Sequence, residues 1–269
     1  MSARVPAVVL GASGYVGAEL LRLLARHPGF DICAAVSRDP GDATPAEHYP
    51  HLAATLGDLA YSSIDAVAQR LGDTADVAVF SAAPHGVSAA MVAALLDGGG
   101  AGWRVVDASA DFRFADRTAY ESIYATEHGA PALLDRFTCA VPEHLAGTPS
   151  QHVAHPGCFA TAMLLGIVPL LREGLVAGPV YAAGITGSTG SGKSPLPTTH
   201  HPERHSNLYA YKPLTHRHAP EVRALCEAAT GQRPALNFVP HSGPFARGIH
   251  MTLQAALARP VDGGEIREM

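Results

Sequence analysis

Short apolar runs alternate with amphipathic segments through the first half of the chain. Val5 to Leu10 is a Val-rich run, typical of a buried strand. In the next segment the leucines of Leu20 to Leu24 share one broad helical face, opposite Arg22 and Arg26. The same patterns predict strands at 5–10, 30–37, 76–83 and 103–109, and helices at 18–27, 64–71 and 85–100.

Strands that alternate with helices form parallel βαβ units. We therefore expect an α/β fold, with a Rossmann-like doubly wound parallel sheet in residues 1–145. After residue 144 the pattern changes, and a second α+β domain is expected in residues 146–269. Its predicted elements are an apolar helix within 154–171, strands at 180–188, 236–240 and 248–257, and a helix at 219–229.

The composition limits the classes of partner. Of 269 residues, 47% are hydrophobic and 16% are charged, which excludes a disordered chain. The formal net charge of −5 gives no basis for phosphate contacts with a nucleic acid. The longest apolar run, Cys158 to Leu171, is too short to span a bilayer and contains a proline. Without a secretory signal before the first strand, we expect a cytoplasmic protein with neither nucleic-acid nor membrane partners.

The segment GASGYVG lies between the first predicted strand and the first predicted helix. Gly11, Gly14 and Gly17 have the spacing that a dinucleotide-binding turn needs for a tight bend, close approach of the pyrophosphate and helix–strand packing. The alternative interpretation is a tight turn that binds nothing. The predicted cofactor contacts of this turn are Gly11, Ser13, Gly14, Tyr15, Val16 and Gly17.

The end of the second predicted strand distinguishes the two nicotinamide cofactors. Ser37 and Arg38 follow that strand, and their donors suit the 2′-phosphate of NADP, whereas Asp39 favours NAD. We predict NADP(H). Because ligands of doubly wound sheets bind at the carboxyl ends of strands, the residues that end or follow the strand at 76–83 are also predicted to line the cofactor cleft: Ala83, Pro84 and Gly86.

The stretch GSTGSGKSP, residues 187–195, satisfies the P-loop pattern G-x-x-x-x-G-K-[ST]. A working P-loop needs a helix directly after it, because the helix N-terminus helps to cradle the phosphates. Pro195, Pro197 and Pro202 oppose a sustained helix there. A P-loop NTPase is therefore disfavoured. A flexible surface loop and a glycine-rich loop that approaches a ligand closely remain as interpretations.

Cys158 is the candidate nucleophile. It opens the predicted apolar helix, where unsatisfied amides and the positive end of the helix dipole favour the thiolate. The alternative, a small buried hydrophobic residue, suits Cys33, Cys139 and Cys226, which fall inside predicted strands and a helix. The four cysteines are widely spaced without a C-x-x-C pair, which argues against a disulfide framework.

A thiolate and a nicotinamide cofactor together indicate one reaction class. The thiolate forms a thioester with an activated acyl group, a hydride reduces the thioester to an aldehyde, and an acid/base residue assists, most often a histidine. His216 and His218 flank Arg217 before the helix at 219–229 and are the candidates. The chain's other clustered histidines lie in proline-rich sequence without nearby Cys ligands, so no metal site is expected; they are His200, His201 and His205.

Eight blocks occur in the order found in the N-acetyl-γ-glutamyl-phosphate reductase family. They are GASGYVG, VSRDP, FSAAPHG, DASADFR, HPGCFAT, GSTGSGKSP, THRHAPEV and PFARGIHMT. The chain resembles this family from about Val8 to Thr252. The resemblance implies NADPH-dependent reduction of N-acetyl-γ-glutamyl phosphate, with release of phosphate and N-acetylglutamate semialdehyde for arginine biosynthesis. We also expect a homo-oligomer that takes a small-molecule acyl phosphate.

The resemblance also implies residue roles. Cys158 falls on the family's nucleophile, and the acid/base histidine falls in THRHAPEV, where we prefer His216 to His218. Ser188 and Gly190 fall in the loop that such reductases carry beside the nicotinamide and the reacting acyl group.

Arg113, in DASADFR, is predicted to recognise the substrate carboxylate, and His218 is the second predicted substrate contact. The alternative for Arg113 is a structural ion pair with Asp107 or Asp111.

Chains of this family continue past the strand at 248–257 with another strand, a glycine-rich segment and a closing helix. We therefore expect this chain, which ends at Met269, to be truncated or divergent. The rival functions are a related acyl-phosphate reductase, either aspartate-semialdehyde dehydrogenase-like or acting on a carrier-bound aminoadipyl phosphate, and a cofactor-binding protein without catalysis.

Overall fold

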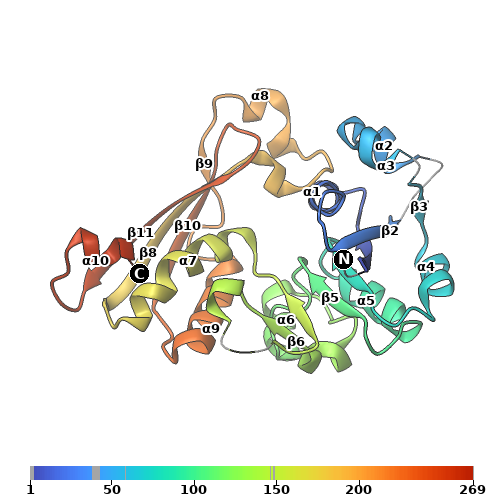
Figure 1. Cartoon of the computed structure of the whole chain (residues 1–269). Helices are drawn as coiled ribbons and strands as arrows, with labels where there is room; N and C mark the ends of the chain where they lie inside the picture. The colour runs from blue at the N-terminus through green and yellow to red at the C-terminus, as the bar shows by residue number, and fades with distance from the viewer. Residues whose placement is uncertain (1–2, 38–42, 58, 146, 148, 269) are drawn as a thin grey trace. The chain divides into compact units, whose positions relative to one another are not determined.

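The computed structural model describes residues 3–37, 43–57, 59–145, 147 and 149–268, and it divides into two compact units (Figure 1). Unit 1 comprises residues 1–139 and 149–155, and unit 2 comprises residues 140–148 and 156–269. This division differs from the boundary expected between residues 145 and 146. The reason is that strand β7 (His152–Ala154) pairs with the sheet of unit 1.

Unit 1 is built on a seven-stranded sheet in the order β3-β2-β1-β4-β5-β7-β6. Its strands are β1 (Val5–Leu10), β2 (Phe30–Val36), β3 (Tyr61–Ser62), β4 (Ala78–Ser81), β5 (Arg104–Asp107), β6 (Phe137–Cys139) and β7. All neighbours pair in parallel, which confirms the predicted doubly wound α/β fold. The strand expected at Cys139 is β6, whereas the sequence did not predict β3 and β7, because two or three residues are too few for a hydrophobic pattern.

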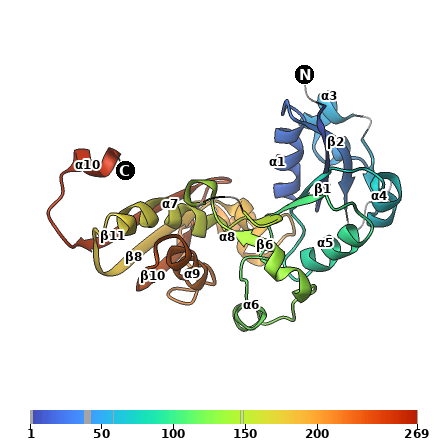
Figure 2. The same cartoon turned by 60° about the horizontal axis from the view of Figure 1, so that its bottom comes forward.

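Helices cover both faces of this sheet (Figure 2). Val8 of β1 belongs to an apolar cluster that includes Val92, whereas its neighbour Val9 belongs to a cluster that includes Leu21. Successive β1 residues thus pack on opposite faces, as expected for a buried parallel strand. The helices of unit 1 are α1 (Tyr15–Leu24), α2 (Pro45–His48), α3 (Ala53–Leu56), α4 (Ile64–Leu71), α5 (Ser88–Asp97) and α6 (Arg117–Tyr124).

Unit 2 is built on a four-stranded mixed sheet in the order β11-β8-β10-β9. Its strands are β8 (Val176–Thr186), β9 (Tyr209–Ala210), β10 (Leu236–Ser242) and β11 (Ile249–Leu257). Helices α7 (Cys158–Arg172) and α9 (His218–Thr230) cover one face, where Ile167, Val222 and Phe238 join one apolar cluster. Within the described residues, alternate β8 side chains such as Tyr181 are exposed on the other face.

Two short helices complete unit 2: α8 (His201–Arg204) and α10 (Gly263–Glu268). None of the helices found in the described part of the chain has the length and hydropathy of a bilayer span.

The turn from β1 to α1 depends on close backbone packing. Gly11 has φ +69°, and a Cβ there would lie 2.5 Å from the carbonyl oxygen of Ala82. A Cβ on Gly17 would lie 2.3 Å from the carbonyl oxygen of Gly11. These contacts bring α1, the end of β1 and the end of β4 together, and only glycine has room for them.

Replacing Gly17 with alanine is expected to destabilise unit 1, because the added methyl group overlaps the Gly11 carbonyl. Overpacking of this kind lowers the free energy of unfolding by about 1–3 kcal/mol. Urea unfolding followed by circular dichroism measures the change. Gly263→Ala is the matched control, since a Cβ there meets no atom within 4 Å. A Gly17→Ala protein as stable as this control would contradict the close packing.

Candidate active site

Two loops of unit 1 lie at the carboxyl ends of the adjacent strands β1 and β4, where the strand order changes direction. Residues 11–14 lead from β1 into α1, and residues 82–87 lead from β4 into α5. A Cβ on Gly14 would contact only the Gly11 carbonyl, at 3.4 Å, so the backbone at this helix N-cap is open to a ligand. Doubly wound sheets bind dinucleotides at such a switch point. The neighbouring predicted contacts are Tyr15, which is half-buried, and Val16, which is exposed.

Hydroxyl groups join the glycine turn to the end of β2. The side-chain oxygens of Ser13 and Ser37 lie 2.9 Å apart, and the Tyr49 hydroxyl donates to the Ser13 carbonyl at 2.7 Å. The sequence did not point to Tyr49, because its contact crosses 36 residues. Arg38 and Asp39, on which the cofactor prediction also rested, lie outside the described residues.

Two buried carboxylates hold the loop after β4. Asp111 accepts a hydrogen bond from the Gly86 amide at 2.7 Å. Asp107, at the end of β5, accepts from the hydroxyls of Ser88 and Ser109 at 2.7 and 2.6 Å. Burial raises the pKa of Asp107. These bonds fix the loop that contains the predicted cofactor residues Ala83, Pro84 and Gly86. Because residues 82–87 form this loop, α5 begins at residue 88 and not at the expected residue 85.

Arg113 is held by backbone carbonyls. Its Nε donates to the carbonyl of His155 and its Nη2 to the carbonyl of Ala108, both at 3.0 Å. The bond to His155 ties the guanidinium to the segment that leads along the chain to Cys158, and the bond to Ala108 ties it to the end of β5.

Cys158 is the first residue of α7 and is exposed. The preceding residue, Gly157, donates its amide to the buried carboxylate of Glu221 in α9 at 2.6 Å. The other three cysteines are half-buried or buried, and burial raises the pKa of Cys226 to about 12. The thiol predicted to be the nucleophile is therefore the exposed one, at a helix N-terminus where thiolates are favoured.

An aromatic cluster surrounds the histidine pair of unit 2. The ring of Phe159, the residue after Cys158, lies 5.9 Å from that of His216 and 6.3 Å from that of His218. The two histidine rings lie 4.6 Å apart. The structure thus brings both predicted histidines next to the start of α7.

His216 has a defined protonation state. Burial, then the charges of Arg217 and Lys212, lower its pKa to about 4, so the ring is neutral at pH 7. Its Nδ1 lies 3.2 Å from the backbone amide of His218, which can only donate. The proton of the neutral ring is therefore on Nε2.

Tyr211 is a site residue that sequence reasoning missed. Its ring lies 5.6 Å from that of His216. Burial, then the charge of Cys158, raise the pKa of Tyr211 to about 12, so the hydroxyl lies within electrostatic range of the thiol. A single tyrosine in a loop has no sequence signal of its own.

The glycine-rich loop after β8 is not a P-loop. One 3-10 turn (Ser188–Ser191) lies within the motif, and a second (Pro197–Thr199) and the four-residue α8 follow it. This described segment therefore has no sustained helix after the motif, as the prolines predicted. The amide of Ser188 donates to the Phe245 carbonyl at 2.9 Å, and that of Gly190 to the Gly187 carbonyl at 3.3 Å. The Ser188 hydroxyl also donates to the Phe245 carbonyl, at 3.3 Å, so these groups serve the loop's own structure.

The described residues contain no group of three or more His, Cys, Asp or Glu placed to hold a metal ion.

We expect His216 to make stability depend on pH. Its pKa of about 4 lies below its ordinary value of 6.5, so between these values the unfolded chain binds the extra proton, and stability falls as the pH falls from 6.5 to 4. His216→Asn should remove up to about one proton from the slope of the unfolding free energy against pH in this window. Urea titrations at several pH values measure it. His51→Asn, at an exposed position, is the control, and equal slopes in the two variants would contradict the burial effect.

Family models match both parts of the chain, and known relatives match nearly its whole length. Residues 6–148 match the model described as the semialdehyde dehydrogenase NAD binding domain, and residues 158–269 match its dimerisation domain. The chain is 43% identical over 258 residues to N-acetyl-gamma-glutamyl-phosphate reductase of Pseudomonas aeruginosa, covering 94% of this chain and 73% of that one. The reductase of the same name from Methanopyrus kandleri is 38% identical over 266 residues, covering 97% and 74%.

Solved structures share the fold. Aspartate semialdehyde dehydrogenase II of Vibrio cholerae, complexed with ASA, has a TM-score of 0.71 at 13% identity and covers 99% of this chain and 78% of its own. The Candida albicans enzyme with NADP has a TM-score of 0.66 at 13% identity and covers 99% and 75%. The family resemblance of the motif blocks is confirmed by the relatives, and the chain belongs to the N-acetyl-gamma-glutamyl-phosphate reductase family.

Proposed function

We propose that this protein reduces N-acetyl-γ-glutamyl phosphate with NADPH to N-acetylglutamate semialdehyde, with release of phosphate, in arginine biosynthesis. The observation that carries the proposal is the exposed thiol of Cys158 at the N-terminus of α7, in a chain 43% identical to a reductase of that name. Such a thiol is suited to attack an activated acyl group. The cytoplasmic location expected from the sequence stays a prediction.

The residues of unit 1 fit a nicotinamide dinucleotide. The open backbone at Gly14 and the first-turn amides of α1 suit the pyrophosphate. The hydroxyls of Ser13 and Ser37, at the end of β2, suit the adenosine ribose and its 2′-phosphate. NADP(H), when bound, supplies the hydride that converts the acyl group into an aldehyde. We propose that Ala83, Pro84 and Gly86, with Ser188 and Gly190, complete the contacts to it.

Cys158 carries the covalent chemistry. Its Sγ forms a bond to the acyl carbon while the bond from that carbon to the phosphate oxygen breaks, and phosphate leaves with the electron pair. Amides at the start of α7 stabilise the thiolate before the attack. After the thioester carbon is reduced, the carbon–sulfur bond breaks, the electron pair returns to Sγ and the aldehyde leaves.

We assign the acid role to His216. With its proton on Nε2, the neutral ring donates a hydrogen bond to the acyl oxygen as negative charge develops there. His218, which lies next to it, is assigned to the substrate and is the alternative acid/base. Arg113, in unit 1, is assigned to an anionic group of the substrate.

The proposed partner is a second copy of this chain. The match of residues 158–269 to a dimerisation domain supports a contact through unit 2. On the sheet face opposite α7 and α9, three rows cross β11, β8 and β10: His250–Ile185–His241, Thr252–Ala183–Val239 and Gln254–Tyr181–Asn237.

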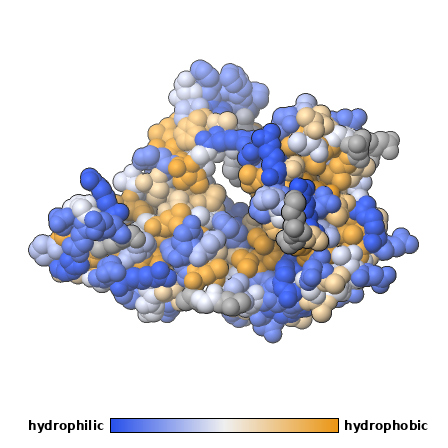
Figure 3. Space-filling view, viewed as in Figure 1, coloured by the Kyte–Doolittle hydropathy of each residue, from blue (hydrophilic) through white to orange (hydrophobic). Residues whose placement is uncertain are grey.

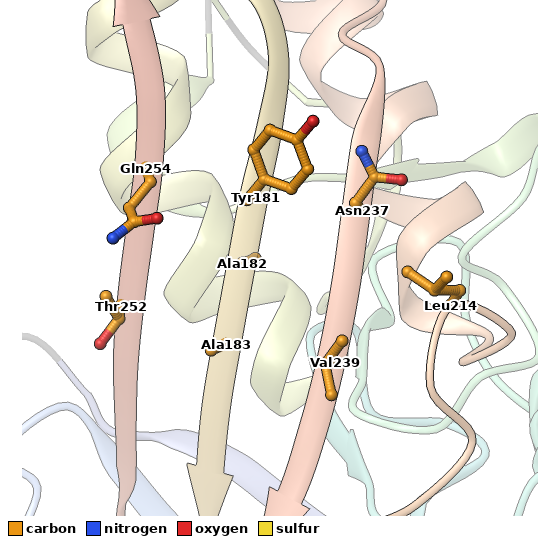
Figure 4. Close-up of a pocket in the computed structure, with 8 residues that line it drawn as sticks. All are labelled: Tyr181, Ala182, Ala183, Leu214, Asn237, Val239, Thr252 and Gln254. Carbon is orange, nitrogen blue, oxygen red and sulfur yellow. The ribbon is translucent and has the colours of Figure 1, made fainter.

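This face has an apolar centre and amide-bearing margins. Tyr181 is 54% exposed and Leu214 is 63% exposed, and they line a shallow hollow of about 360 Å³ with α7 behind the sheet (Figure 4). The region of α10, by contrast, is hydrophilic (Figure 3). A self-complementary face with apolar residues at its centre suits a two-fold interface.

Replacing Cys158 with serine is expected to lower turnover by at least about 10³-fold, because the hydroxyl is a far weaker nucleophile. The phosphate-dependent reduction of NADP or NAD by N-acetylglutamate semialdehyde, followed at 340 nm, measures it. Cys33→Ser, in β2, is the matched control and keeps activity. Full activity of the Cys158 variant would refute the proposal.

The same assay separates related functions. A preference for aspartate semialdehyde or for a carrier-bound aminoadipate semialdehyde would replace N-acetylglutamate semialdehyde as the proposed substrate.

His216→Asn and His218→Asn, compared in parallel, identify the residue that acts as the acid. Loss of turnover in the His218 variant alone would refute the role of His216.

Tyr181→Asp is expected to weaken self-association by at least about 100-fold, since it places a charge at the centre of the proposed interface. Light scattering after size-exclusion chromatography measures the oligomeric state. Leu23→Asp is the control, because Leu23 is equally exposed, at 58%, on α1 of unit 1. A Tyr181→Asp protein with the unchanged oligomeric state would rule out this face.

A further inference from the structure

Arg204, the last residue of α8, is a buried cation without a hydrogen bond. Its exposed fraction is 8%, and in the described part of the chain none of its three guanidinium nitrogens has a partner. The guanidinium cannot lose its charge at any physiological pH. Buried charges in proteins are stabilised by opposite charges or by hydrogen bonds. The side chain therefore points to an anion that the described residues do not supply.

The surroundings connect Arg204 to the nucleophile. Its guanidinium carbon lies 5.8 Å from the ring centre of Tyr209, which pairs with Ser242 at the carboxyl end of β10. Tyr211 follows two residues later, so both tyrosines lie on one side of an extended segment, about 7 Å apart. Burial, then the charges of Cys158 and Tyr209, raise the pKa of Tyr211. Arg204 thus contacts Tyr209, and Tyr209 and the thiol both interact electrostatically with Tyr211, all within unit 2.

The surrounding segment is basic in a protein that is acidic overall. Residues 187–218 contain four Lys or Arg and one Glu, whereas the whole chain has a net charge of −5. Three residues of this segment adopt a left-handed backbone without being glycine: Ser206, Lys212 and Leu214. Such strain concentrates at ligand sites, where the surrounding structure enforces it.

We propose that Arg204 binds the free carboxylate of the acyl-phosphate substrate and so positions the acyl carbon for attack by Cys158. The inference rests on the proposed function and names the group by which the enzyme distinguishes its substrate. The carboxylate forms a charge-assisted pair with the guanidinium, while the acyl phosphate lies towards Tyr211 and the thiol. Arg204 and Cys158 belong to the same unit, whereas Arg113 belongs to the other and already donates to two carbonyls.

The test compares N-acetylglutamate semialdehyde with its α-carboxamide in the phosphate-dependent oxidation. Arg204→Met should raise KM for the acid by about 100-fold with little change in kcat, and leave KM for the amide unchanged. KM for phosphate should also stay unchanged. Arg233→Met, which removes an exposed charge from unit 2, is the control and keeps the wild-type preference for the acid.

Folding and ligand binding are followed in the same variants. Arg204→Met should melt at the same or a higher temperature than the wild type, because a buried unpaired charge has been removed. N-acetylglutamate should raise the melting temperature of the wild type but not of this variant, a readout that needs no turnover.

The inference fails if Arg204→Met still prefers the acid, if Arg113→Met loses the preference instead, or if only KM for phosphate changes. A large drop in melting temperature would also overturn it, since Arg204 would then be structural. A wild type without turnover refutes the proposed function, and the N-acetylglutamate melting shift still decides the role of Arg204.

Discussion

A hydrogen bond between the buried carboxylate of Glu221 and the backbone amide of Gly157 sets how α7 and α9 lie in unit 2. Glu221 has no exposed surface and accepts from the Gly157 amide at 2.6 Å, which joins α9 to the N-terminus of α7. Cys158 is the next residue, and His218 lies less than one turn before Glu221 on the same helix. Loss of this bond would leave a buried carboxylate without that donor, an expensive state in a protein interior. One contact thus relates the proposed nucleophile, Cys158, to the histidine pair.

In the proposed function both units use a helix N-terminus for anionic chemistry, but on different scaffolds. In unit 1 the start of α1 follows β1 at the switch point of a sheet that is covered on both faces, which suits a pyrophosphate. In unit 2 the start of α7 presents a thiol, and the described elements cover one face of its sheet. The covered side holds the residues to which we assign catalysis, and the other side carries the proposed interface. The two sides of one sheet can therefore serve catalysis and association separately.

The glycine-rich segments illustrate why context decides the meaning of a motif. GASGYVG follows a buried strand and enters an amphipathic helix, and its backbone at Gly14 is open. GSTGSGKSP has the spelling of a P-loop, but its prolines stop the helix, and amides such as that of Ser188 donate to the protein's own carbonyls. An amide already engaged in this way cannot also cradle a phosphate. The difference lies in the flanking residues, so it was readable from the sequence.

The sequence by itself determined the elements and the local chemistry. Hydrophobic periodicity predicted the main strands and helices, and the position of Cys158 at a helix start followed from its immediate neighbours, because these signals act over a few residues. Tertiary structure alone decided the contact between Glu221 and Gly157, which are 64 residues apart, the link of Tyr49 to Ser13, and the electrostatic interaction of Tyr211 with the thiol. It also decided that Arg204 is buried. Burial and long-range hydrogen bonds depend on which distant segments pack together, and no local pattern along the chain encodes that choice.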